Sequence, residues 1–215
     1  MQQVLLATLR QQARNPLTWA LLVLALISWP ISVAIAPLTT TLSSGAAAHL
    51  SYDIAFIALI VGVLFGDMRL EELRWLLCRQ SPPRVAASSV LLLASSSLLP
   101  AVLCLVPMAI LSAHVPGGVL MNLVLAALHL AVIVQLLNSL GFSPSSRSVG
   151  IPILALLLPA SIPSGAGPFS FLWRLLDPLA GAPLENTSFT MITFQLGSIV
   201  ALYLLACAPR LIPTQ

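Results

Sequence analysis

The sequence contains no lysine, and charged residues make up only 7% of its 215 residues. All the basic charge therefore comes from arginine, and the formal net charge at pH 7 is +3. Hydrophobic residues make up 59% of the chain, and the mean hydropathy is +1.03. A soluble domain of this size has too little interior to bury so much apolar surface, so the composition predicts an integral membrane protein.

Motifs of soluble enzymes are also missing. The sequence has no GxxxxGK[ST] phosphate loop, no HExxH and no GxSxG, which excludes ATP binding by a phosphate loop and the two hydrolase types. The three cysteines, Cys78, Cys104 and Cys207, stand singly, without the spacing of a metal or redox site. We interpret Cys104 and Cys207 as packing residues. We therefore expect no catalytic residues, no metal and no directly bound cofactor.

Long apolar runs predict an all-α polytopic protein with six transmembrane helices in a single domain, 1–215. The expected spans are 17–36, 46–66, 85–111, 119–141, 149–163 and 189–208. Residues 1–15 are expected to form an interfacial helix before the first span, which we interpret as retained and not as a signal peptide.

The fifth run, 149–163, is short for a span. At 1.5 Å per residue it covers roughly 22 Å of a hydrocarbon core about 30 Å thick. The aromatic segment 168–179 follows it. We expect the stretch 164–187 to re-enter the outer interface and complete the layer.

The distribution of arginine predicts the orientation. With both termini in the cytosol, Arg174 alone lies outside, and the inner side holds the other eight: Arg10, Arg14, Arg69, Arg74, Arg79, Arg84, Arg147 and Arg210. This bias agrees with the positive-inside rule and with contacts to anionic lipid headgroups. We expect a multi-pass protein of a bacterial cytoplasmic membrane, with no nucleic-acid partner.

The segment 66–84 carries four of the nine arginines and three of the six acids. Three leucines recur on one helical face: Leu70, Leu73 and Leu77. Two pairs of opposite charge have i,i+3 spacing: Arg69 with Glu72, and Glu71 with Arg74. Pro82 and Pro83 end the pattern. We therefore predict a short cytosolic helix after the second span, and because topology alone does not require its acids, we interpret it as a docking element.

Polar residues inside the expected spans are candidates for function, because burying them in lipid is unfavourable. His129 and Asn122, seven residues apart, share a helical face, whereas Gln135 and Asn138 point roughly the other way. Hydrogen bonds between helices and a role along a substrate path both fit His129 and Asn122. His49 and Asp53 lie one turn apart near the outer end of the second span, where Asp53 lies either within the membrane or among the headgroups.

Small residues in the third and sixth spans fit close helix packing better than chemistry. They are Ser88, Ser95, Thr190, Thr193 and Gly197.

The chain resembles a membrane subunit of the type-2 ABC exporter family. The matching features are Arg-Asn-Pro at 14–16 before the first span, six spans, the inner loop around Leu70-Glu71-Glu72-Leu73, and a Pro/Gly-rich stretch, IPSGAGPFSFLWRLLDPLAG. Its length and the segment LLLPASIP are also similar to the haem-exporter membrane subunit of cytochrome c maturation. The resemblance covers nearly the whole chain.

This resemblance implies that the inner loop is a coupling helix docked on a separate cytosolic ATPase. Glu71, Glu72 and Arg74 would contact that ATPase, with Leu70 and Leu73 as anchors. ATP and Mg would bind to the ATPase, and two permease subunits, usually identical, would form the path. The main alternative is a membrane scaffold or assembly factor, including one that handles haem. A secondary transporter is less favoured, because no matched pair of broken helices stands out.

Overall fold

The computed structural model describes residues 44–77, 82–112, 117–161, 175–176 and 189–207, and seven single positions between 10 and 27. Throughout these residues the long elements are all helices: α3 (Ser44–Leu77), α4 (Pro82–Ser112), α5 (Gly117–Ser139), α6 (Pro144–Ser161) and α8 (Phe189–Cys207). The described part of the chain is therefore all-α, as predicted. The expected interfacial helix 1–15, first span 17–36 and re-entrant stretch 164–187 lie almost entirely outside it.

Three helices match the predicted spans closely. The bounds of α4, α5 and α8 lie within three residues of the expected spans 85–111, 119–141 and 189–208. Two stretches, Arg84–Val106 and Gly118–Ser139, have the length and apolar composition to cross a membrane, and Ile192–Cys207 is apolar but shorter.

The second span and the segment after it form one helix, which differs from the prediction. We expected a span ending at Gly66 and then a separate short helix, but α3 continues unbroken for 34 residues. A glycine inside a helix destabilises it by only about 1 kcal/mol relative to alanine, and Gly66 is offset by its packing on α4. The charged segment is therefore a direct continuation of the helix α3.

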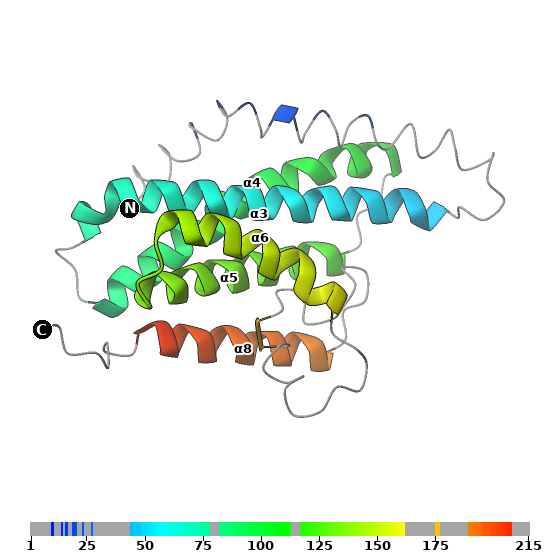
Figure 1. The fold of residues 1–215 in the computed structure, drawn as a ribbon. Helices are drawn as coiled ribbons and strands as arrows, with labels where there is room; N and C mark the ends of the chain where they lie inside the picture. Colours follow the sequence, from blue (N-terminus) through cyan, green and yellow to red (C-terminus); the bar gives the residue numbers. More distant parts are fainter. Residues whose placement is uncertain are drawn as a thin grey trace, which may run out of the picture.

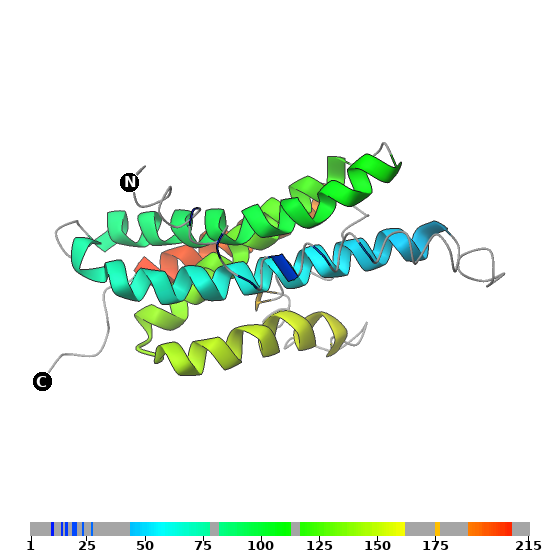
Figure 2. The same ribbon diagram turned by 90° about the horizontal axis from the view of Figure 1, so that it is seen from above.

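The arrangement of the helices is shown in Figures 1 and 2. α3 and α4 form an antiparallel pair with the most extensive contact in the bundle, α5 packs on α4, and α8 packs on α5. Seen from above, α3 lies between α4 and α6 (Figure 2). The contacts of α6 with α3 and α5 are much fewer than those between α3 and α4.

Glycine allows α3 and α4 to approach closely. A Cβ added to Gly62 would lie 2.6 Å from Ser97 Cα and 2.7 Å from the carbonyl oxygen of Ser96, and one added to Gly66 would meet Ser96 Oγ. The Ser96 hydroxyl donates to the Gly62 carbonyl oxygen at 3.2 Å. This Gly-x-x-x-Gly pattern packs on small residues, as is common between membrane helices.

The small residues that we expected at helix contacts differ between the two helices. Ser88 and Ser95 on α4 are half-buried, and Ser95 directly precedes the Ser96 and Ser97 that lie against Gly62. Thr190, Thr193 and Gly197 are exposed on α8, and a Cβ on Gly197 would meet nothing within 4 Å. The expectation is therefore wrong for packing of α8 within the described part of the chain, because the spacing of small residues does not say which helix face is inside.

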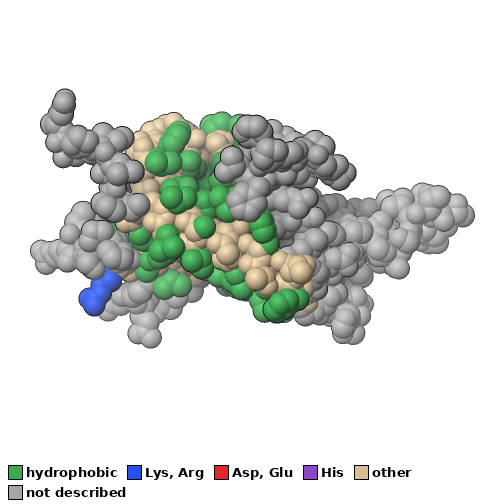
Figure 3. All heavy atoms as spheres, turned by 90° about the horizontal axis from the view of Figure 1, so that it is seen from below, with side chains coloured by type: hydrophobic (Ala, Val, Ile, Leu, Met, Phe, Trp, Pro, Cys, Tyr) green, Lys and Arg blue, Asp and Glu red, His purple; other side chains and the backbone are tan. Residues whose placement is uncertain are grey.

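The described residues combine a hydrophobic core with many exposed large apolar side chains and several buried polar ones. Every described long helix exposes large apolar side chains, among them Met68, Leu91, Met121, Ile153 and Leu204. The buried set includes ten polar or charged residues: Asp67, Ser89, Ser96, Ser97, Asn122, His129, Gln135, Arg147, Gln195 and Ser198. On the face that carries α8, hydrophobic side chains are spread across the described surface among backbone and other side chains (Figure 3). This distribution favours a lipid environment.

Candidate functional site

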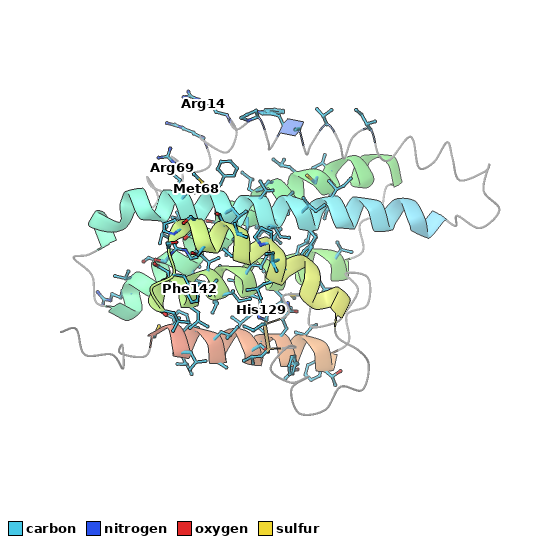
Figure 4. The ribbon with its side chains drawn as sticks, viewed as in Figure 1. Arg14, Met68, Arg69, His129 and Phe142 are labelled. Carbon is cyan, nitrogen blue, oxygen red and sulfur yellow. The ribbon has the colours of Figure 1, made fainter. Side chains whose placement is uncertain are left out.

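The five residues predicted to couple to an ATPase lie in the last two turns of α3. Leu70 is only 4% exposed and belongs to the hydrophobic core, so its side chain stabilises the bundle instead of forming part of the surface. The side chains of Glu71, Glu72, Leu73 and Arg74 lie outside the described residues. Just before them, Met68 is 63% exposed, and Met68 and Arg69 point away from α5 and α8 (Figure 4).

A buried ion pair joins this end of α3 to α6. Arg147 Nε donates to Asp67 Oδ2 at 2.9 Å, and Arg147 Nη2 donates to Asp67 Oδ1 at 3.1 Å. The side chains are 1% and 5% exposed, respectively. Two parallel hydrogen bonds between a guanidinium and a carboxylate are the strongest and most directional geometry that such a pair adopts.

The remaining terminal nitrogen of Arg147 binds the end of α5. Its Nη1 donates to the Phe142 carbonyl oxygen at 2.6 Å and to Asn138 Oδ1 at 3.3 Å. The guanidinium therefore connects three elements: α3 through Asp67, α5 through Asn138, and the α5–α6 turn through Phe142. Phe142 lies at this turn in Figure 4.

Local sequence fixes the turn that presents Arg147. Gly141 has a φ of +85°, a conformation that favours glycine, and it closes α5. The Phe142 amide donates to Leu137 O and the Gly141 amide to Asn138 O, which is the Schellman pattern of a helix C-terminus.

Helix α6 begins with its own cap. The Ser143 hydroxyl accepts a hydrogen bond from the Ser146 amide at 3.2 Å, and Pro144 occupies the first helical position. The helix α6 therefore begins at Pro144, five residues before the expected span 149–163. The first turn of α6 places the Arg147 side chain against α3 and the end of α5.

Burial makes the Asp67–Arg147 pair sensitive to the loss of either member. Removing a charge from water is unfavourable by several kcal/mol per ion, and here the partner charge and the polar atoms around Arg147 offset it. Removing one member would leave the other charged and desolvated. Loss of either member alone is therefore expected to be strongly destabilising.

Sequence reasoning missed this pair. Arg147 was used only as an inner positive charge, and Asp67 was included in the charged segment without a role. The sequence contains only a weak indication of the pair. Asp67 and Arg147 each lie at the inner end of an expected span, and both were predicted on the cytosolic side. Nothing in the sequence pairs two residues 80 positions apart.

His129 forms a hydrogen bond inside the bundle. It is fully buried, and its Nε2 lies 2.9 Å from the carbonyl oxygen of Leu175, in the expected re-entrant stretch. Among the described residues, its Nδ1 and the buried Gln135 Oε1 have no hydrogen-bond partner. Figure 4 shows His129 between α5 and α8. Two alternatives were given for His129, a hydrogen bond between helices and a role along a substrate path. The contact with Leu175 agrees with the first of them. Asn122, on the same helix, is also buried.

The other candidates are placed only in part. His49 and Asp53 lie one turn apart near the start of α3, and their side chains are outside the described residues. Cys104 is buried and Cys207 is half-buried, and both are free thiols. Among the described residues, no three His, Cys, Asp or Glu side chains gather as a metal site would require.

Comparisons with protein-family models, with curated proteins and with solved structures find no match to this chain. Its structural features must therefore be interpreted from the residues themselves, and the resemblance to type-2 ABC exporters remains a prediction from the sequence.

Proposed function

We propose that this chain is the permease subunit of an ABC exporter, embedded in a bacterial cytoplasmic membrane with both termini in the cytosol. In this proposal six spans form one unit, a second copy of the chain completes the path, and a separate cytosolic ATPase binds ATP and Mg. The single observation that carries the proposal is the length of α3. At 34 residues it is about 51 Å long, against a hydrocarbon core of about 30 Å.

The excess length of α3 supports a docking role for its charged end. A helix of this length that starts near the outer interface extends beyond the lipid on the inner side. Its last turns contain Arg69, Glu71, Glu72 and Arg74, and α4 begins at Pro82, with Arg84 exposed in its first turn. Both signs of charge on a rigid helix provide the complementarity that a protein partner requires.

The buried polar residues support an apolar or amphipathic substrate. Among the described buried groups, the only charged ones are Asp67 and Arg147, which neutralise each other. The others are the neutral side chains of serine, asparagine and glutamine, together with His129. A polyanionic substrate would need cationic groups along its path, and these helices offer it none that is buried without a counter-charge.

The docking role is tested by reversing the acids at the end of α3. With its ATPase present in membranes, Glu71→Arg/Glu72→Arg is expected to reduce stimulation of ATP hydrolysis at least tenfold. The matched control is Asp177→Arg/Glu185→Arg, which makes the same change in charge on the predicted outer side and should keep stimulation near wild type. Unchanged stimulation in the first variant, or equal loss in both, would contradict docking through α3.

Co-purification tests the proposal at the level of composition. The complex isolated from native membranes is expected to contain a nucleotide-hydrolysing subunit in a fixed ratio to this chain, measured by mass. A complex without such a subunit would favour the scaffold or assembly-factor alternative.

A further inference from the structure

We propose that Asp67 and Arg147 form a latch, a connection with a closed buried state and an open hydrated state, that holds the inner end of α6 against α3. The latch is a property of this chain alone. Its use in carrying force from an ATPase to α6 rests on the proposed function above.

The geometry gives the latch two stable states. When closed, the two charges are almost completely removed from water and satisfy each other through two hydrogen bonds. When open, both charges can be hydrated, because they lie at the predicted boundary between the membrane and the cytosol. A separated pair that stays buried is strongly unfavourable, since each ion then lacks both its partner and water. The pair is therefore expected to switch between these states instead of loosening gradually.

The packing of α6 makes this latch decisive for its position. Within the described residues, α6 has few contacts with α3 and α5. Among residues 144–155, whose side chains are described, Ile151 and Ala155 are buried besides Arg147, and Leu154 is partly buried against the core, whereas Val149 and Ile153 are exposed. A helix held by a few apolar contacts and one ion pair can move away from α3 at the ion-paired end when the pair separates.

The position of Asp67 connects the latch to the predicted docking segment. Asp67 precedes Glu71 by one helical turn in the unbroken helix α3. A displacement of the charged end of α3 therefore moves Asp67 directly. The other side of the latch is anchored through Asn138 and Phe142, so movement of Asp67 pulls against the α5–α6 turn.

The latch is tested first on the chain alone in lipid nanodiscs, by measuring distances between spin labels. Labels on Met68→Cys and Val149→Cys, both at exposed positions, report the α3–α6 distance after the native cysteines are replaced by alanine. Labels on Leu91→Cys and Met121→Cys report the α4–α5 distance as a control. We expect one main α3–α6 distance with the native pair. Asp67→Asn should add a longer one and change the ratio of the two populations at least tenfold, while the control distance stays the same.

Two outcomes of this measurement would overturn the latch. An α3–α6 distance unchanged by Asp67→Asn would mean that the pair does not hold α6. Broadening of both the α3–α6 and the control distance distributions would mean that the substitution disrupts the whole bundle. That result is expected if the ion pair is purely structural.

An apolar replacement separates the latch from the proposed function. Asp67→Leu/Arg147→Met removes both charges, so no ion remains to be hydrated in an open state. This variant should therefore keep the single short α3–α6 distance, with α6 held closed. With the ATPase present, this variant should lose at least tenfold in stimulation although it remains folded. Full stimulation would overturn force transmission through the latch. If the native chain does not stimulate ATP hydrolysis by the ATPase, the proposed function is contradicted. The distance measurement still tests the latch in that case.

Discussion

The helix α3 makes two contacts of opposite physical character. Against α4, Gly62 and Gly66 bring two backbones together over Ser96 with no charged group. Against α6, a carboxylate and a guanidinium are joined in a buried ion pair, and α3 contacts α6 much less extensively than it contacts α4. One helix therefore combines a contact that depends on volume with one that depends on charge.

The two contacts differ in what competes with them. Close packing of small residues has no good substitute in lipid or water, so separating α3 from α4 is always unfavourable. Ions do have a substitute, because water solvates them well wherever they can reach it. We infer that the α3–α4 pair is a fixed unit and that the α3–α6 contact is the one that can change.

The largest expected effect comes from removing one charge of the ion pair. Asp67→Ala and Arg147→Ala should each lower the free energy of unfolding by roughly 3–5 kcal/mol, because the remaining ion either stays buried without its partner or is hydrated only when the α3–α6 contact opens. Asp67→Leu/Arg147→Met should be close to neutral, since no buried charge remains. Unfolding of the detergent-solubilised protein measures the free energy of unfolding of all three variants. A loss in the double variant equal to the sum of the two single losses would contradict a buried ion pair.

A smaller effect is expected at the α3–α4 contact. Gly62→Val should lower the free energy of unfolding by roughly 1–3 kcal/mol, because the new atoms meet the backbone of Ser96 and Ser97. The control is Gly197→Ala, where the added Cβ meets nothing within 4 Å. It should stabilise α8 by about 0.5–1 kcal/mol through helix propensity. Equal effects at both glycines would mean that α3 and α4 are not closely packed.

The smallest expected effect concerns the cap that begins α6. Ser143→Ala should cost about 1 kcal/mol, because the Ser146 amide loses its acceptor. The loss should be local, with faster hydrogen exchange in the first turn of α6 and little change in α3 and α4. Ser148→Ala is the control, since that hydroxyl donates only to the carbonyl oxygen of Ser145 within the same helix. Faster exchange throughout α4 would show that α6 is more tightly integrated than its contacts indicate.

Helix positions were the most predictable part of the fold. The ends of α4, α5 and α8 follow from apolar runs bounded by proline, glycine or polar residues. The start of α6 was predicted too late, because its first turn is polar and serine-rich. The break expected at Gly66 was wrong because tertiary packing outweighs the intrinsic preference of one glycine.

The candidate site was predictable only in outline. The charged segment and the buried positions of Asn122 and His129 follow from local composition. The Gly-x-x-x-Gly spacing of Gly62 and Gly66 is a signal that could have indicated close packing but did not identify α4 as the partner. The burial of Leu70 could not be foreseen, because the leucine face of an amphipathic segment is the same whether it meets a partner protein or its own core.

By itself, the sequence determined that the described chain is helical, where most helices lie and which segment concentrates the charge. These properties depend on neighbouring residues, on local hydrogen bonding and on the hydrophobicity of each side chain. Only the tertiary structure decided that Asp67 meets Arg147, that Gly62 lies against Ser96 and Ser97, and that Thr193 and Gly197 face outward. Such contacts join residues far apart in the chain, and their identity depends on how complete helices pack, which no local pattern encodes.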